Sequence, residues 1–168
     1  MFTAHTLETA PAAAHAAMRA LQSTTGTVPD AVRRLAGSPE LLNGFLAMSA
    51  SFEGCTLDSM AREVVIMTVA VRNDCHVCIA MHTGKLRKLG APPEIVSALR
   101  AAAPLPDARL EAIRVFTLDL LATAGGVDDA SVTAFMAQGY TERNALEVVL
   151  GIGTYTMSTL ANRLVRAA

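Results

Sequence analysis

Apolar residues recur three and four positions apart along most of the chain, which is the spacing of one face of an α-helix. Between residues 57 and 72, for example, Met60, Val64 and Met67 follow one another in this way. No stretch of strand length alternates between apolar and polar residues. The pattern therefore predicts an all-α fold whose helices are joined by short loops.

Start and stop signals divide this pattern into separate helices. Ser38, Pro39 and Glu40 combine a cap residue, a first-turn proline and a first-turn acid, so a helix is expected to begin there. Glycines and prolines end or interrupt the pattern further along. The signals also predict helices over about 10–21, 57–72, 74–89, 93–101, 107–124, 128–139 and 141–166. We expect residues 1–37 to form an N-terminal helical arm and residues 38–168 to form one domain.

The composition narrows the class of protein. The 168 residues suffice for about one domain, and 52% of them are hydrophobic, which excludes a disordered chain. Charged residues make up only 17%, against about 25% in an ordinary soluble domain. We therefore expect part of the apolar surface to be covered by other subunits.

Charge and hydropathy exclude several kinds of partner. The net charge is −1 and no basic patch stands out, which argues against nucleic acid. The longest uninterrupted apolar stretches, such as 64–67, are far shorter than the ~18 residues that span a bilayer. The first ten residues do not combine a basic start with an apolar block, so no signal peptide is expected. These features predict a cytoplasmic protein that binds neither nucleic acid nor membranes.

Three cysteines are present, at positions 55, 75 and 78. This low, odd number does not resemble the disulfide framework of a small extracellular protein. Cys75 and Cys78 form a C-x-x-C pair, which in a reducing compartment is either redox-active or metal-binding. Cys55 stands near the end of a predicted helix and is interpreted as a structural thiol.

A histidine joins the C-x-x-C pair on one predicted helical face. Cys75, Cys78 and His82 occupy positions i, i+3 and i+7, so their side chains project within about 60° of one another. Cys78 and His82 are i, i+4 neighbours, close enough for a thiol–imidazole contact. Cys75 is expected in the first helical turn, where unpaired N–H groups favour a thiolate.

A carboxylate is expected beside this histidine. If the helices over 57–72 and 74–89 fold back antiparallel about Asn73, residue 63 faces roughly residue 83. Glu63 lies on an apolar helical face, where a lone carboxylate is costly without a partner, and His82 is the nearest candidate. We predict a Glu63–His82–Cys78 chain in which the carboxylate orients the imidazole and the imidazole takes the thiol proton.

The expected chemistry is the reduction of a peroxide. A thiolate can attack the O–O bond and become a sulfenic acid. The second cysteine then condenses with this sulfenic acid to give a disulfide and water. An external dithiol or a reductase must then reopen that disulfide. The order of attack is open, because the helix start favours Cys75 whereas the imidazole neighbour favours Cys78.

Glu63, Cys75-His76-Val77-Cys78 and His82 together resemble the motif of the AhpD-like alkylhydroperoxidases of the carboxymuconolactone decarboxylase superfamily. The resemblance extends from about residue 38 to the C-terminus. It implies an AhpD-like all-α fold with a central antiparallel helix hairpin, a homotrimer or homohexamer, and no cofactor or metal. It also implies peroxidase activity on a hydroperoxide substrate.

The same resemblance implies a role for each of the four residues. Cys78 would react with the peroxide, Cys75 would resolve the sulfenic acid, and Glu63 and His82 would form the proton relay. One departure is that Val77 stands where the best-known member of the family has a histidine. The superfamily's decarboxylase branch lacks the cysteine pair, so its reaction is not carried over.

Two other functions are compatible with the same residues. The first is a non-catalytic thiol redox sensor, which would form the disulfide without cycling. The second is a metal-stabilised interaction module, in which Cys75, Cys78, His82 and either Glu63 or Asp74 bind zinc. A C-x-x-C within one helix fits poorly with zinc, because structural zinc sites usually place it on a turn.

A weak internal repeat relates residues 60–66 to residues 144–150, at an offset of 84. At that offset the two cysteines and the histidine correspond to Thr159, Asn162 and Arg166. The second copy would share the helical packing but lack the chemistry. Duplication and chance similarity between two amphipathic helices both remain open.

Overall fold

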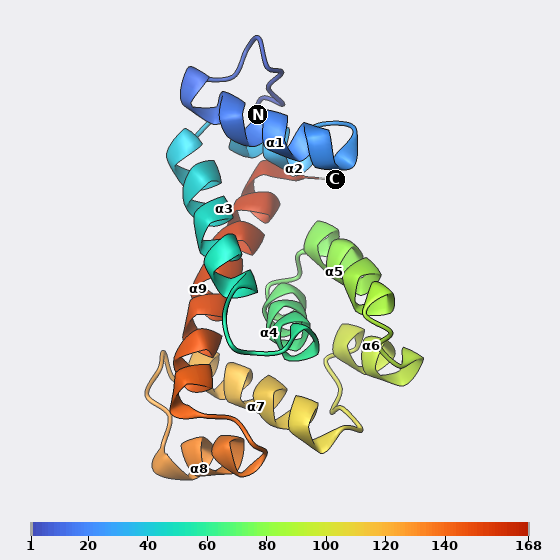
Figure 1. The fold of residues 1–168 in the computed structure, drawn as a ribbon, viewed down its shortest axis with the longest axis vertical. Helices are drawn as coiled ribbons and strands as arrows, with labels where there is room; N and C mark the ends of the chain where they lie inside the picture. Colours follow the sequence, from blue (N-terminus) through green and yellow to red (C-terminus); the bar gives the residue numbers. More distant parts are fainter. Residues whose placement is uncertain (1, 168) are drawn as a thin grey trace.

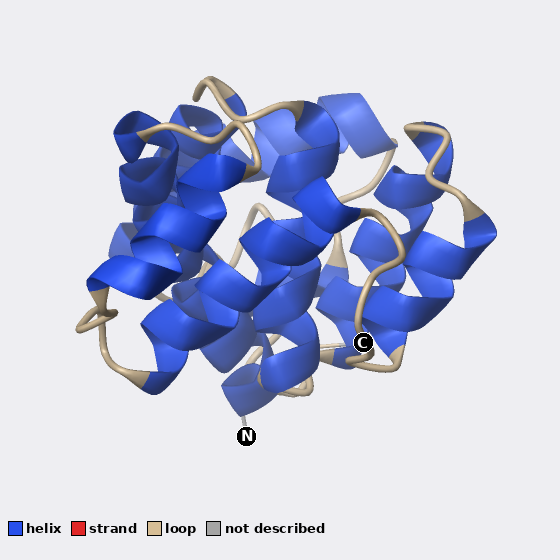
Figure 2. Ribbon diagram, turned by 90° about the horizontal axis from the view of Figure 1, so that it is seen from below, coloured by secondary structure: helices blue, strands red, loops and turns tan. Residues whose placement is uncertain are grey.

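The computed structural model describes residues 2–167, which fold into helices joined by short loops, with no strand among them (Figures 1 and 2). The elements are η1 (Ala12–Ala14), α1 (His15–Thr25), α2 (Asp30–Leu35), α3 (Pro39–Glu53), α4 (Ser59–Arg72), α5 (His76–Lys88), α6 (Pro93–Arg100), α7 (Ala108–Ala122), α8 (Asp129–Ala137) and α9 (Glu142–Val165). The predicted all-α class is confirmed.

The capping residues explain why most helices begin where the sequence predicts. The side chains of Ser38, Asp107, Asp128 and Thr141 each accept a hydrogen bond from a backbone N–H in the first turn that follows. The predicted helix over 10–21 is instead η1 followed by α1, which continues to residue 25. Helix α2 is missing from the prediction, because six residues are too few for the three-and-four spacing to repeat.

Helix α4 lies at the centre of the molecule, between α9 and α5, with α7 below it in Figure 1. Every residue from 63 to 70 is buried, so this helix is covered on all sides rather than on one face. Two polar members of that stretch, Glu63 and Thr68, need partners inside the core. Glu63, a candidate site residue, is therefore also part of the buried core.

Helix α9 approaches α3 and α4 closely at Gly151. A Cβ atom at this position would lie 2.6 Å from Cζ of Phe52 and 3.0 Å from Cγ1 of Val65. Both neighbours are fully buried, so neither side chain has room to move aside. The glycine thus permits the helix contacts that bring the C-terminal half of α9 against the α4–α5 turn.

The N-terminal segment packs on the C-terminal end of α9. Met18 of α1 and Leu35 of α2 form a small apolar cluster with Leu42 of α3 and Val165 of α9. The division into a helical arm of 1–37 and a domain of 38–168 remains a prediction. No helix between residues 2 and 167 has both the length and the apolar composition needed to cross a bilayer.

Glu147 of α9 joins the core through a dense set of hydrogen bonds. Its carboxylate accepts bonds from the backbone N–H groups of Thr56 and Leu57 at 2.9 and 3.1 Å, from the Thr56 hydroxyl, and from Asn144 and Arg143 at 3.0 Å. Burial by itself raises the pKa of Glu147, but the hydrogen bonds outweigh it and hold the pKa at about 2. The charged carboxylate therefore stabilises the fold.

Replacing Glu147 with glutamine is expected to lower the free energy of unfolding near pH 7 by about 3 kcal/mol, given the drop from an ordinary pKa of 4.5. A pKa lowered by folding adds stability above the unfolded value and loses it as the pH falls from about 4.5 towards 2. Urea unfolding measured at several pH values should show the difference in stability between the two proteins shrinking as the pH falls below about 4.5. Glu142→Gln, at an exposed position one turn away, is the control and should change little. Equal stability of the Glu147→Gln protein and the parent at pH 7 would contradict the prediction.

Candidate redox site at the turn between α4 and α5

The turn between α4 and α5 determines where the cysteines lie. Asn73 ends α4, Asp74 adopts a left-handed backbone with φ 52°, and the Cys75 N–H donates to the carbonyl of Ala70 at 2.9 Å. Cys75 has an extended backbone and is the N-cap of α5, which begins at His76. The expected placement of Cys75 within the first turn of a helix from 74 is therefore wrong. The left-handed residue that reverses the chain leaves Cys75 one step outside the helix.

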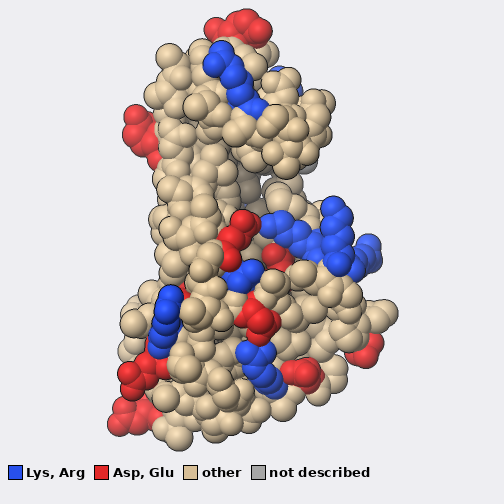
Figure 3. Space-filling view, viewed as in Figure 1, with Lys and Arg blue, Asp and Glu red and all other residues tan. Residues whose placement is uncertain are grey.

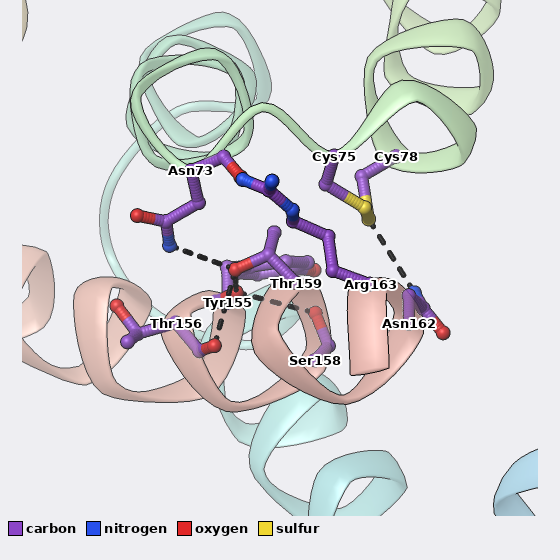
Figure 4. The surroundings of a disulfide bond; sticks show 9 residues. All are labelled: Asn73, Cys75, Cys78, Tyr155, Thr156, Ser158, Thr159, Asn162 and Arg163. Atoms are coloured by element: carbon purple, nitrogen blue, oxygen red, sulfur yellow. Dashed lines mark hydrogen bonds between the residues drawn. A yellow bond between two sulfur atoms is a disulfide. The ribbon is translucent and has the colours of Figure 1, made fainter. Parts of the chain in front are cut away.

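Cys75 and Cys78 are joined in a disulfide, with their Cα atoms 5.4 Å apart. The sulfurs lie beneath the turn and face α9, as Figure 4 shows. Cys75 is 1% exposed and Cys78 is 4% exposed, and both pack against Ala70. A pair at the N-cap and the third helical position can thus be bridged while the helix is intact.

Glu63 of α4 and His82 of α5 form the buried pair that the hairpin register predicts. Glu63 Oε2 lies 2.7 Å from His82 Nδ1, and the two side chains are 9% and 5% exposed. With Nδ1–H donating to the carboxylate, Nε2 is the ring nitrogen left to accept a proton. The imidazole and the ring of Tyr155 pack in a T-shaped arrangement, with ring centroids 5.5 Å apart.

The predicted thiol–imidazole contact is absent from this disulfide form. Within the described residues no hydrogen bond joins Cys78 to His82, although they are one helical turn apart. The disulfide draws Cys78 Sγ back towards Cys75, whereas Glu63 holds the imidazole ring against α4. Cys78 and His82 therefore lie one turn apart on α5 with no hydrogen bond between them among residues 2–167.

Helix α9 supplies site residues that the sequence analysis did not assign. Asn162 Nδ2 donates a hydrogen bond to Cys78 Sγ at 3.4 Å, and Tyr155 packs on His82. Burial raises the pKa of the Tyr155 hydroxyl, so the phenol stays protonated near neutral pH. The one signal for Asn162 was the internal repeat, in which it corresponds to Cys78.

Comparison with known proteins relates part of this chain to a known family. Residues 39–118, which include Glu63, both cysteines of the pair and His82, match the carboxymuconolactone decarboxylase family. This part of the chain is therefore similar in sequence to the carboxymuconolactone decarboxylase family. Among curated proteins, none matches the sequence at a significant level.

Solved structures confirm the AhpD-like fold of this chain. An uncharacterized peroxidase-related protein from Ralstonia eutropha JMP134, described as an alkylhydroperoxidase AhpD core, is 20% identical with a TM-score of 0.84 over 97% of this chain and 88% of that chain. A peroxidase-related protein from Silicibacter sp. TM1040 is 22% identical with a TM-score of 0.78, over 94% and 85%. A protein of unknown function from Agrobacterium tumefaciens, whose description relates it to the antioxidant defence protein AhpD, is 16% identical with a TM-score of 0.67, over 79% and 91%.

Two cavities flank the buried groups of the site. A cavity of about 440 Å³ reaches Glu63 and is bordered by Arg62, Lys85 and Lys88. Figure 3 shows Lys and Arg side chains gathered over α5, with acidic groups beside them. A second cavity of about 240 Å³ reaches the disulfide and has this lining: Asp74, Cys75, His76, Val77, Asn162, Arg163, Arg166 and Ala167. The carboxylate and the sulfurs are thus approached from different sides.

The remaining candidate groups are placed as follows. Cys55 is a free, half-buried thiol between α3 and α4, and burial raises its pKa, which suits the expected structural role. Throughout residues 2–167, no three His, Cys, Asp or Glu side chains are grouped so that they could hold a metal ion. Of the five residues considered as zinc ligands, Cys75 and Cys78 form the disulfide, Glu63 and His82 pair with each other, and Asp74 lies 3.7 Å from Arg163.

Proposed function

We propose that this protein is a cysteine-dependent peroxidase that reduces hydroperoxides through a Cys75–Cys78 dithiol/disulfide cycle. The observation that carries the proposal is the position of a buried Glu63–His82 pair one helical turn from a buried, bridgeable cysteine pair. The printed descriptions of the structural relatives, peroxidase-related and antioxidant, point in the same direction.

In the first step Cys78 acts as the nucleophile. His82, oriented by Glu63, takes the thiol proton at Nε2, either directly after reduction or through one water. The thiolate attacks the hydroperoxide, so an S–O bond forms and the O–O bond breaks. The departing alkoxide takes the proton back from the imidazolium and leaves as an alcohol.

In the second step Cys75 resolves the sulfenic acid. Its sulfur attacks Cys78 Sγ, the S–S bond forms, and the hydroxyl group leaves as water. An external dithiol or protein reductant then exchanges with the disulfide, becomes oxidised, and returns both cysteines to the thiol form. Because Cys75 lines the 240 Å³ cavity, we infer that the reductant attacks this sulfur.

Assembly and location are part of the same proposal. Large apolar side chains on α9, among them Leu146 (72% exposed) and Leu164 (65% exposed), support a homotrimer or homohexamer that covers them. We place the cycle in the cytoplasm, where thiol reductants keep such a pair reducible. Neither nucleic acid nor a membrane is a partner in this proposal.

The test is turnover of the purified protein with a dithiol and a panel of peroxides. Hydrogen peroxide, an alkyl hydroperoxide and a lipoyl-type dithiol are suitable reagents. We expect many turnovers, with one dithiol oxidised for each peroxide consumed. Formation of one disulfide per chain without further cycling would instead indicate a redox sensor. Near-stoichiometric zinc in protein purified without chelator would favour the metal-stabilised module.

A further inference from the structure

Asn162 is a buried amide whose surroundings do not explain it. The residue is 7% exposed. Its side-chain Nδ2 donates a hydrogen bond to Cys78 Sγ at 3.4 Å. Its Oδ1 atom is buried and has no hydrogen-bond partner within residues 2–167. Burying an unpaired carbonyl oxygen costs about 1–3 kcal/mol, and an apolar side chain of similar size would avoid that cost. Packing alone therefore does not account for an amide here.

The contacts around Asn162 hold the amide against the sulfur. The next residue of α9, Arg163, donates a hydrogen bond to the carbonyl of Asn73 and lies 3.7 Å from the Asp74 carboxylate. One turn earlier, Thr159 Oγ1 accepts a hydrogen bond from Asn73 Nδ2 at 2.8 Å. Figure 4 shows Asn73, Thr159 and Arg163 on the same side of the turn as the disulfide. They fasten the α4–α5 turn to α9 and so keep Asn162 beside Cys78.

We propose that Asn162 is a catalytic residue of the Cys75–Cys78 centre, whose amide N–H stabilises negative charge on Cys78 Sγ. An N–H group donates more strongly to a thiolate than to a thiol or a disulfide sulfur, because the bond to a charged acceptor is charge-assisted. The amide therefore favours the charged sulfur over its neutral forms. This inference rests on the peroxidase function proposed above.

The same contact acts twice in the cycle. During oxidation it stabilises the Cys78 thiolate that attacks the hydroperoxide. During reduction the thiolate of the external dithiol attacks Cys75 Sγ, the disulfide breaks, and Cys78 departs as the thiolate that Asn162 receives. A stabilised thiolate is a better leaving group, so the reduction of the disulfide by the external dithiol is faster.

Several titratable or charged groups surround the sulfurs and share in their electrostatics. Asp74 lies in the turn, Glu63 on α4, and His76 and His82 on α5. Arg163 lies on α9 and Arg166 directly follows that helix. Asn162 carries no charge, so its removal changes the hydrogen bonding of the sulfur and leaves this set of charges intact. Its effect can therefore be separated from theirs.

The test measures the titration of Cys78 in a protein whose other cysteines are serine (Cys55→Ser and Cys75→Ser). Thiolate absorbance and alkylation by iodoacetamide are followed against pH, with and without Asn162→Leu. We expect the leucine substitution to raise the pKa of Cys78, to slow alkylation and the single reaction with hydrogen peroxide about 10-fold near neutral pH, and to lose this effect at high pH. Asn162→Ala, which cannot overpack the site, should act in the same direction.

Ser158→Ala is the matched control. This serine lies one turn before Asn162, and among residues 2–167 its hydroxyl donates only to the Tyr155 carbonyl of its own helix, so the Cys78 titration should not move. An unchanged titration in both Asn162 variants, or a shifted titration with an unchanged peroxide rate, would overturn the catalytic assignment. A shifted titration in a protein that never turns over peroxide would overturn the peroxidase function and leave the amide–thiolate contact standing.

Discussion

Cys78→Ser protein is expected to consume hydroperoxide at least about 10³-fold more slowly than the parent protein, because the nucleophile is gone. A serine hydroxyl near Asn162 and the Glu63–His82 pair cannot be oxidised to the equivalent of a sulfenic acid. The measurement is the loss of peroxide under turnover with excess dithiol. Trapping of sulfenic acid by a dimedone-type reagent should succeed in Cys75→Ser protein and fail in Cys78→Ser protein.

The control for this substitution is Cys55→Ser. Cys55 is a free thiol outside the turn, so its loss should leave the rate within about twofold of the parent rate. Sulfenic acid trapped on Cys75 in the Cys78→Ser protein would reverse the assigned order of attack. Normal turnover by Cys78→Ser would remove the peroxidase assignment.

Glu63→Gln is expected to lower the rate of peroxide consumption near pH 7 by about 10²-fold, the usual size of an acid–base contribution. Glutamine keeps the size of the side chain and an oxygen for His82 Nδ1, but it cannot stabilise the charged imidazole at 2.7 Å. The imidazole then takes the Cys78 proton less readily, and the thiol pKa rises. The difference in rate between Glu63→Gln and the parent protein should shrink towards pH 9, where hydroxide deprotonates the thiol without the help of the imidazole.

Glu147→Gln is the matched control for this experiment. It is the same change in the other buried glutamate, at the position that the internal repeat equates with Glu63. It should lower stability yet leave the rate unchanged wherever the protein stays folded. Parent-like rates for Glu63→Gln over the whole range from about pH 5 to pH 9 would contradict the proton relay.

The central hairpin could be predicted because its determinants are local. Helices α4 and α5 are joined by a turn of three residues, so the distance of each residue from the turn sets its partner across the hairpin. Glu63 and His82 meet on that basis, and the apolar face around Glu63 made the pairing with a histidine favourable. The caps at Ser38, Asp107 and Thr141 were equally local, since each bonds a backbone group within three residues.

The turn itself was predicted only in part. The reversal at Asn73 was expected, but the left-handed Asp74 and the extended Cys75 depend on how the chain leaves one buried helix and enters the next. The same holds for the distance between Cys78 and His82. Helical spacing predicts a shared face, whereas the disulfide and Glu63 decide where each side chain points.

By itself, therefore, the sequence determined the helical class, most helix starts, and the set of four residues gathered at one hairpin. Only the tertiary structure placed Asn162 on Cys78 and Tyr155 on His82, across 84 residues in the first case. The reason is that α9 reaches the turn through contacts between distant segments, such as Gly151 against Phe52. Periodicity along one helix carries no information about which distant helix packs on it or at what height.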